Sequence, residues 1–170
     1  MVGDKILLRA LEPEDLDFLY QIENDVENWE ISETKIPFSK YLLHEYLKTV
    51  GEDISKTGQL RLVVEDKSTH KPLGLIDLFE YDAINSRCGI GLIINAENRN
   101  SGIGTESLIL LSEYCKNTLN LHQLYCDIQS NNKESILFFE KNNFKKTGIK
   151  KDWNLKADNF LDVLFYQKIL

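Results

Sequence analysis

Apolar residues follow two different periods along the chain, and the changes between them predict the elements of secondary structure. They recur every three or four positions where one face of a helix is buried, and at every second position in strands. Helices are expected at about 11–23, 38–54, 102–119 and 132–141. Strands are expected at 5–9, 60–65, 73–81, 87–94, 123–129, 144–153 and 160–168. The segment 24–37 follows neither period and is predicted to be an acidic loop.

The order of these elements predicts a single α+β domain that spans residues 1–170. The strand-rich middle, with a turn at 66–72, favours antiparallel hairpins, and the helix, strand, helix and two strands that follow extend the same sheet. We therefore expect a mixed, mostly antiparallel central sheet of about seven strands, flanked by about four helices. With 170 residues, of which 42% are hydrophobic, the chain can bury a core without disulfides or a structural metal.

The balance of charges narrows the class of partner. The chain has 20 Lys and Arg against 27 Asp and Glu, a net charge of -7, and no run of basic residues longer than two. Nucleic-acid binding needs a basic stripe, so nucleic acid is not expected, whereas cationic partners are favoured. The sequence has no apolar run of about 20 residues and does not begin with a basic and apolar leader. We expect a cytoplasmic protein that does not associate with membranes.

The three cysteines, Cys88, Cys115 and Cys126, each lie within an apolar pattern. Their number is odd, and none of them forms a Cys-x-x-Cys pair. We predict that they are reduced thiols of the core, and we expect no metal site.

The segment Arg99-Asn100-Ser101-Gly102-Ile103-Gly104-Thr105 lies between a predicted strand and a predicted helix. Its two glycines let the main chain approach a ligand closely, and the start of the helix offers unpaired N–H groups and a positive dipole end. This combination suits a pyrophosphate group. The chain has no Gly-x-x-x-x-Gly-Lys-Ser/Thr motif, which excludes a P-loop, and Ser107 stands where a dinucleotide fingerprint has its third glycine. A glycine-rich connection that binds nothing is the alternative.

With this motif, the chain resembles the Gcn5-related N-acetyltransferases (GNAT), whose acetyl-CoA loop follows the pattern Arg/Gln-x-x-Gly-x-Gly/Ala. Residues 7–16 are similar to the opening of the branch that contains spermidine N-acetyltransferases and ribosomal-protein N-terminal acetyltransferases, and 73–87 to their central hairpin. Residues 132–144 resemble the family's segment Asn-x-x-Ala/Ser-x-x-x-Tyr-x-Lys-x-Gly-Phe. The matches follow one another in order over nearly the whole chain. They imply a GNAT-like fold and acetyl-CoA as co-substrate.

The resemblance also implies which residues hold acetyl-CoA. Main-chain groups of Leu92 and Ile94 would meet its acetyl and pantetheine part where two strands separate. The pyrophosphate would be held by main-chain amides of Asn100, Ser101, Gly102, Ile103, Gly104 and Thr105. Arg99 would lie at the entrance of the loop, Asn132 would hydrogen-bond to the pantetheine, and Lys141 would reach the adenosine phosphates. Asn132 also suits the N-cap of an ordinary helix.

Acetylation of an amine needs two proton transfers, one away from the ammonium and one to the leaving thiolate. The family usually supplies the second proton from a Tyr, and the matching residue here is Phe139, which cannot donate. Three explanations are open: water or another phenol such as Tyr81 or Tyr125 donates, the thiolate leaves unassisted, or the protein binds acyl-CoA without turnover. The candidate catalytic residues are Asp77 and Tyr81. Asp77 follows an apolar run, and burial there would raise the pKa of its carboxyl towards useful values.

Four glutamates are candidates for binding the acceptor. Glu27, Glu30 and Glu33 lie in the predicted acidic loop, where they would attract a cation or simply form a solvated surface. Glu80 lies in the same predicted strand as Asp77. Strand alternation places these two residues on opposite faces, so at most one of them would point to the substrate.

These observations lead us to expect an acetyl-CoA-dependent N-acetyltransferase in which a primary amine attacks directly within a ternary complex. A polyamine-like molecule or a protein N-terminus is the expected acceptor. Phe139 leaves a second hypothesis, a non-catalytic acyl-CoA-binding or regulatory module. A dinucleotide-binding domain is the third, and NAD but not CoA would stabilise it. A homo-oligomer is left open.

Overall fold

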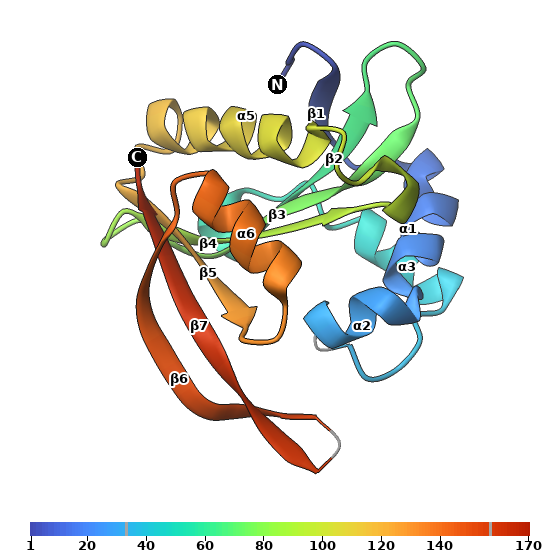
Figure 1. Cartoon of the computed structure of the whole chain (residues 1–170). Helices are drawn as coiled ribbons and strands as arrows, with labels where there is room; N and C mark the ends of the chain where they lie inside the picture. Colours follow the sequence, from blue (N-terminus) through green and yellow to red (C-terminus); the bar gives the residue numbers. More distant parts are fainter. Residues whose placement is uncertain (33, 157) are drawn as a thin grey trace.

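The computed structural model describes residues 1–32, 34–156 and 158–170, without the side chains of residues 30–32 (Figure 1). Its strands are β1 (Ile6–Ala10), β2 (Leu60–Asp66), β3 (Pro72–Asp82), β4 (Arg87–Ile94), β5 (Gln123–Gln129), β6 (Lys145–Lys156) and β7 (Asn159–Ile169). Its α-helices are α1 (Leu16–Glu23), α2 (Val26–Ser32), α3 (Lys40–Leu47), α4 (Ile54–Thr57), α5 (Ile103–Asn117) and α6 (Lys133–Lys141). Two 3-10 turns, η1 (Pro13–Asp15) and η2 (Ala96–Asn98), precede α1 and α5.

All seven of these strands join one sheet in the order β1-β2-β3-β4-β5-β7-β6. The pairs are antiparallel except for β4 with β5, which is parallel. A parallel pair needs a crossover between its strands, and α5 supplies it. The predicted α+β class and the mixed, mostly antiparallel sheet are therefore confirmed.

The number of helices differs from the prediction: the described residues form six α-helices, and about four were expected. The predicted helix 38–54 is divided into α3 and α4, each with its own N-cap, Ser39 and Asp53. The predicted acidic loop contains α2, so Glu27 and Glu30 lie on a helix. Within the described chain, no helix is both long enough and apolar enough to cross a membrane.

Contacts to the preceding helix explain why α2 forms without an apolar period. Asn28 is buried, and its Nδ2 donates to the carbonyl of Ile22 at 3.2 Å. The Nε1 of Trp29 donates to the carbonyl of Glu23 at 2.9 Å. Both carbonyls belong to the last turn of α1, where main-chain acceptors have no partner within the helix. The position of α2 is therefore fixed by tertiary hydrogen bonds.

Each face of the sheet has its own core. Helix α5 and helix α6 cover one face, where Leu108, Leu111 and Cys115 pack with alternate residues of β4 and β5 (Figure 1). Helices α1 and α3 cover part of the other face through a smaller cluster that includes Leu19, Leu43 and Leu75. Helices α1 and α3 therefore do not cover the part of this second face that β5 and β7 form.

The three cysteines are free and buried, as predicted. Burial raises the pKa of the Cys88 and Cys115 thiols to about 12, because the thiolate form loses its hydration. Cys126 shows the same direction of shift for the same reason. All three thiols are therefore protonated and unreactive at neutral pH.

A buried ion network fixes the start of α1 to the sheet. Arg9 on β1 donates to both carboxylate oxygens of Asp15, at 2.6 and 2.8 Å, and also pairs with Glu65 on β2. Asp15 and Glu65 are only 5% and 6% exposed. Burial opposes the ionised form of Asp15, but hydrogen bonds from Arg9 and from the Glu12 main chain lower its pKa. The network therefore holds α1, and with it α2, over the sheet.

We predict that Arg9→Met destabilises the fold by about 3 kcal/mol, because it leaves two buried carboxylates without their cation. Urea denaturation at pH 7 measures the change. The matched control is Lys40→Met, which breaks the exposed Lys40–Asp17 pair and should leave the midpoint nearly unchanged. The effect of Arg9→Met should shrink as the pH falls, because Asp15 without Arg9 is protonated at a higher pH than in the native protein, which removes the unpaired charge. It should be smallest below the lowered pKa of native Asp15, where the native ion pair is lost as well. Equal midpoints for the two variants would contradict this role of the network.

Candidate functional site

The sheet opens between its two central strands. β4 and β5 pair only at Arg87 with Gln123, Cys88 with Leu124 and Gly89 with Tyr125. Beyond these pairs β4 continues to Ile94 along β3, whereas β5 continues along β7. We call the space between Ile90–Ile94 and Cys126–Gln129 the β4–β5 opening. Main-chain N–H and C=O groups along its edges have no partner strand and can bind a ligand.

The segment 99–105 forms a tight loop that leads into α5. Asn100 and Gly102 have positive φ angles of 61° and 88°, and Gly102 is the N-cap residue. The hydroxyl of Ser101 donates to the carbonyl of Asn98 at 2.6 Å, which closes the loop. Left-handed residues within such a loop turn successive main-chain N–H groups towards one point, and the dipole of a 15-residue helix adds to their attraction for an anion.

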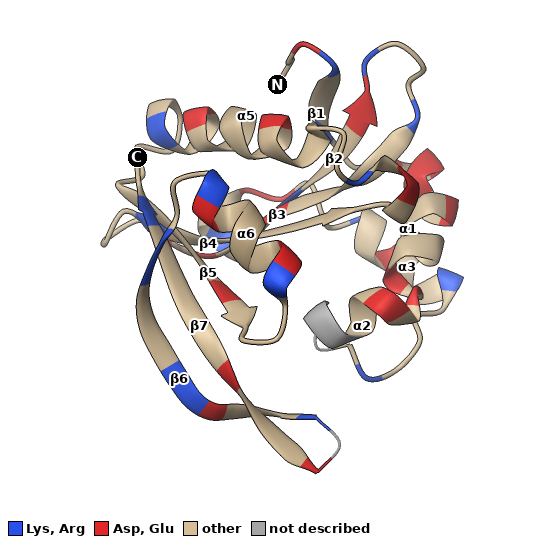
Figure 2. Cartoon of the chain, in the orientation of Figure 1, with Lys and Arg blue, Asp and Glu red and all other residues tan. Residues whose placement is uncertain are grey.

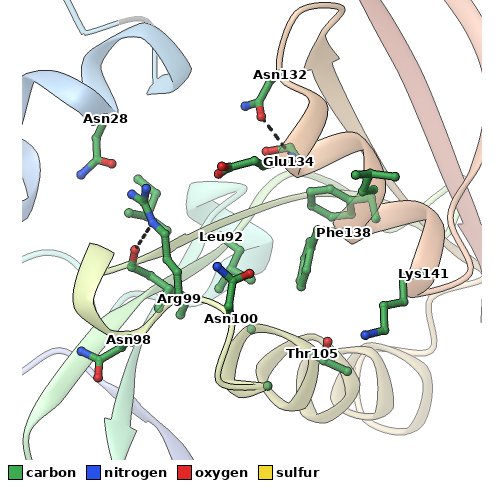
Figure 3. A pocket seen from close by; sticks show the side chains of 17 residues that line it. Asn28, Leu92, Asn98, Arg99, Asn100, Thr105, Asn132, Glu134, Phe138 and Lys141 are labelled. Atoms are coloured by element: carbon green, nitrogen blue, oxygen red, sulfur yellow. Dashed lines mark hydrogen bonds between the residues drawn. The ribbon is translucent and has the colours of Figure 1, made fainter.

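A cavity of about 490 Å³ connects this loop to β4 and α6 (Figure 3). We call it the first cavity. Nine of the eleven residues predicted to bind acetyl-CoA line it: Leu92, Ile94, Arg99, Asn100, Gly102, Gly104, Thr105, Asn132 and Lys141. The other two, Ser101 and Ile103, do not line it, and the side chain of Ile103 belongs to the core. The predicted cofactor residues, drawn from three separate segments, thus meet around one cavity.

Three polar side chains of the first cavity have defined positions. The Nε of Arg99 donates to the carbonyl of Ile94 at 3.0 Å, so Arg99 fastens the loop to the end of β4. The Oδ1 of Asn132 accepts from the Ser135 main chain at 3.0 Å, so Asn132 is the N-cap of α6 and its Nδ2 is the atom that can turn to a ligand. Lys141 extends from α6 towards Thr105 in Figure 3.

Phe139 lies in the wall of the first cavity and is 7% exposed. Its ring packs edge-on against Phe138 and Phe144, with centroids 5.2 and 5.0 Å away. A hydrophobic contact therefore occupies the place of the family's proton donor. Phe138 and Asn28 also line this cavity and were not predicted. Phe138 is next to the motif position and not at it, and the segment that forms α2 has no recognisable sequence pattern.

Asp77 lies on the other face of the sheet, beside the β4–β5 opening. In the register of the sheet Arg61, Asp77 and Gly91 form one row across β2, β3 and β4. Arg61 donates to both oxygens of Asp77, at 2.7 and 3.1 Å, and pairs with Glu23 of α1 at 2.5 Å. Burial alone would lower the pKa of Arg61, but the charge of Asp77 outweighs it and the pKa is raised. Asp77 is therefore paired with a permanent cation.

Glu80 lies on the same face as Asp77, contrary to the expectation from strand alternation. The β3–β4 register shifts between Phe79 and Asp82, and Glu80 has a φ of 51°. Such a bulge re-aims a side chain. Glu80 accepts a hydrogen bond from the Tyr125 hydroxyl at 2.6 Å. Both residues line a second cavity, of about 350 Å³, with Arg87, Gln123, Asp127, Lys150, Phe165 and Gln167.

The remaining predicted site residues lie elsewhere. Tyr81 lines neither cavity, and its side chain packs against the core on the α5 face. Glu27 is exposed on α2 and also lines neither cavity. Glu30 belongs to α2 but its side chain is outside the described part, and Glu33 lies outside the described residues.

Comparisons with known proteins agree with this architecture. A family model described as acetyltransferase (GNAT) domain matches residues 5–145. The spermidine N(1)-acetyltransferase of Escherichia coli (strain K12) is 28% identical over 145 residues, which are 84% of this chain and 74% of that protein. The spermidine N-acetyltransferase of Vibrio cholerae, solved in complex with CoA and spermine, has a TM-score of 0.87 at 23% identity, over 98% of this chain and 96% of that one. A dodecameric structure of the Vibrio cholerae enzyme has a TM-score of 0.80 at 22% identity, over 98% and 95% of the two chains.

We predict that Gly104→Val weakens CoA binding at least about tenfold, the equivalent of about 1.4 kcal/mol. A Cβ at position 104 would lie 3.2 Å from Phe138 and 3.3 Å from Leu92, so the larger side chain enters the first cavity. Titration calorimetry with CoA measures the effect. Gly51→Val is the matched control, because no atom lies within 4 Å of a Cβ at position 51. Equal CoA affinities for the two variants would show that the ligand does not bind beside Gly104.

Proposed function

The chain belongs to the acetyltransferase (GNAT) family, and from this premise we propose that it transfers the acetyl group of acetyl-CoA to a primary amine of a polyamine such as spermidine. The observation that carries the proposal is the first cavity, which joins the N-terminus of α5 to the β4–β5 opening. A cofactor with a phosphate end and a thioester end needs a binding site with these two parts. The names of the curated relatives support spermidine as acceptor.

Different residues of the first cavity would bind different parts of the cofactor. Main-chain amides of residues 100–105 would bind the pyrophosphate, assisted by the dipole of α5 and by Lys141. Main-chain groups of Leu92 and the main-chain N–H of Ile94, whose carbonyl already accepts from Arg99, would bind the pantetheine and orient the thioester in the opening. The amide of Asn132 would be a further partner. This arrangement presents the carbonyl carbon to the face where Asp77 lies.

The reaction proceeds in the ternary complex by attack of the neutral amine nitrogen on the thioester carbonyl carbon. A C–N bond forms, the C–S bond breaks, and the sulfur leaves as thiolate. Asp77, held in place by Arg61, is the candidate base that takes one proton from the bound ammonium and so generates the neutral amine that attacks. The second N–H proton passes to water as the amide forms. Phe139 has no hydroxyl, Tyr81 lines neither cavity, and the Tyr125 hydroxyl donates to Glu80. The thiolate, whose thiol has a pKa of about 8.5, would therefore leave unassisted and take a proton from water.

The distribution of charge on the protein favours a cationic acceptor. Acidic residues cluster along η1, α1 and α2, whereas β6 is rich in lysine (Figure 2). A polyamine carries several positive charges, and the excess of carboxylates near one end of the sheet attracts it. The buried free thiols fit a reducing compartment, for which we propose the cytoplasm. The dodecameric relative supports a homo-oligomer for this chain too.

We predict that the native protein releases the CoA thiol when acetyl-CoA and spermidine are both present, and that mass spectrometry detects acetylated spermidine. Reactions without amine measure the background hydrolysis. Peptides that begin with Ala or Ser test the protein N-terminus as acceptor. Binding of CoA without thiol release from any of these acceptors would favour the non-catalytic module and refute the proposed reaction.

We predict that Phe139→Tyr changes the rate of thiol release less than about threefold, because the native site does not depend on a phenol at this position. Steady-state kinetics with spermidine measure it, and thermal unfolding with and without CoA verifies that the variant folds and binds. A variant that is active where the native protein is not would identify a binding module that has lost its proton donor.

A further inference from the structure

The second cavity contains a carboxylate with an unusual set of neighbours. Lys150 pairs with Asp127 at 2.6 Å, and Arg87 pairs with Asp82 at 3.2 Å. Glu80 instead accepts a hydrogen bond from the Tyr125 hydroxyl, and no Lys or Arg among the described residues forms an ion pair with it. The two basic residues of the cavity are thus paired with other carboxylates, whereas the negative charge of Glu80 is held in place by a neutral donor.

The backbone at Glu80 is held in a conformation that favours glycine. Its φ is 51°, which strains a residue with a long side chain, and such strain is found at sites where a side chain is held for binding. Here the strain belongs to the bulge that turns Glu80 to the face of Tyr125. The Tyr125 ring in turn is packed against Phe165 and Phe79, with centroids 5.5 and 6.3 Å away. The position of the carboxylate is therefore fixed by aromatic packing.

The second cavity lies next to the β4–β5 opening. Tyr125 is the β5 residue of the last β4–β5 pair, and its neighbours Leu124 and Cys126 are buried on the α5 face. Alternation therefore places Tyr125 on the opposite face, away from the first cavity. Phe79 connects the two regions, because its ring covers Gly89 and lies 3.9 Å from where a Cβ at Gly91 would be.

We propose that Glu80, positioned by Tyr125, binds a second ammonium group of the acceptor while the reacting amine lies beside Gly91 and Asp77. This inference rests on the proposed acetylation of an amine and specifies how the amine is held. Glu80 is three positions after Asp77 in β3, so their main chains are at most about 10 Å apart along the strand. A chain with two amino groups joined by short alkyl segments spans such a distance, and its methylene groups contact the Phe79 ring.

The ligand class follows from this chemistry. The Glu80 carboxylate accepts hydrogen bonds from an ammonium, and the faces of Tyr125 and Phe165 stabilise a cation nearby. A monoamine can fill the reacting position but not the second one. Diamines and polyamines should therefore be preferred over monoamines with the same alkyl group.

The test compares Glu80→Gln, which keeps the size of the side chain but removes its charge, with the native protein. We expect KM for spermidine to rise at least about tenfold with little change in kcat, as befits loss of a charge-assisted hydrogen bond that is already made in the ground state. Tyr125→Phe should raise KM less, since the carboxylate remains but loses its positioning donor. Glu113→Gln, an exposed carboxylate on α5, is the matched control and should change nothing.

Two further measurements keep this inference separate from the proposed function. The ratio of kcat/KM for a diamine over the corresponding monoamine should fall towards one in Glu80→Gln, whereas the CoA affinity by calorimetry should be unchanged. Calorimetric binding of spermidine to the CoA complex should weaken by the same factor as KM rises, even if no acetyl-CoA is turned over. If the native enzyme is active and Glu80→Gln leaves its KM for spermidine unchanged, the Glu80 site is wrong. The same holds if the native protein is inactive and Glu80→Gln leaves its affinity for spermidine unchanged. Neither result would bear on the proposed acetylation.

Discussion

Parallel pairing between β4 and β5 ends after three residue pairs, and the first cavity lies along the part of β4 that continues beyond this end. Each strand is bound to a different partner: β4 follows β3 up to Ile94, and β5 pairs with β7 at seven positions. The two halves of the sheet therefore diverge. Main-chain groups left unpaired in a protein interior are costly unless water or a ligand satisfies them. The opening thus offers a ligand main-chain groups in the middle of the sheet, which no side-chain substitution removes.

Strand alternation then separates the two substrates. Leu124 and Cys126 on β5, and Cys88 and Ile90 on β4, point to the face covered by α5 and α6, where the cofactor loop lies. Gly89 and Gly91 point to the other face and have no side chains to close the opening there. A donor on one face and an acceptor on the other meet through the opening, which is the geometry that direct attack in a ternary complex requires.

The net charge of -7 favours the binding of a cationic acceptor and does not favour the binding of the cofactor. CoA is a polyanion, and in the proposed function the loop at 99–105 would bind it with main-chain N–H groups and the dipole of α5, with Lys141 as a local cation. These short-range interactions prevail over a diffuse repulsion that salt screens within about 10 Å. The carboxylates on the other face are placed to act on a cation, with Arg61 and Tyr125 each fixing one of them.

The sequence by itself determined the local features. The loop at 99–105, the N-cap residue Asn132 and the alternation of the strands each need only residues that are neighbours in the chain, and nine of the eleven predicted cofactor residues surround one cavity. Tertiary structure alone decided α2, the pairing of Asp77 with Arg61, and the bulge that turns Glu80 to Tyr125, 45 residues away. These features rest on contacts between distant segments, and a single strand or helix carries no periodic signal for them. The physical reason is that local propensity fixes where a helix or a strand begins, whereas the direction and charge state of a side chain depend on the elements that pack against it.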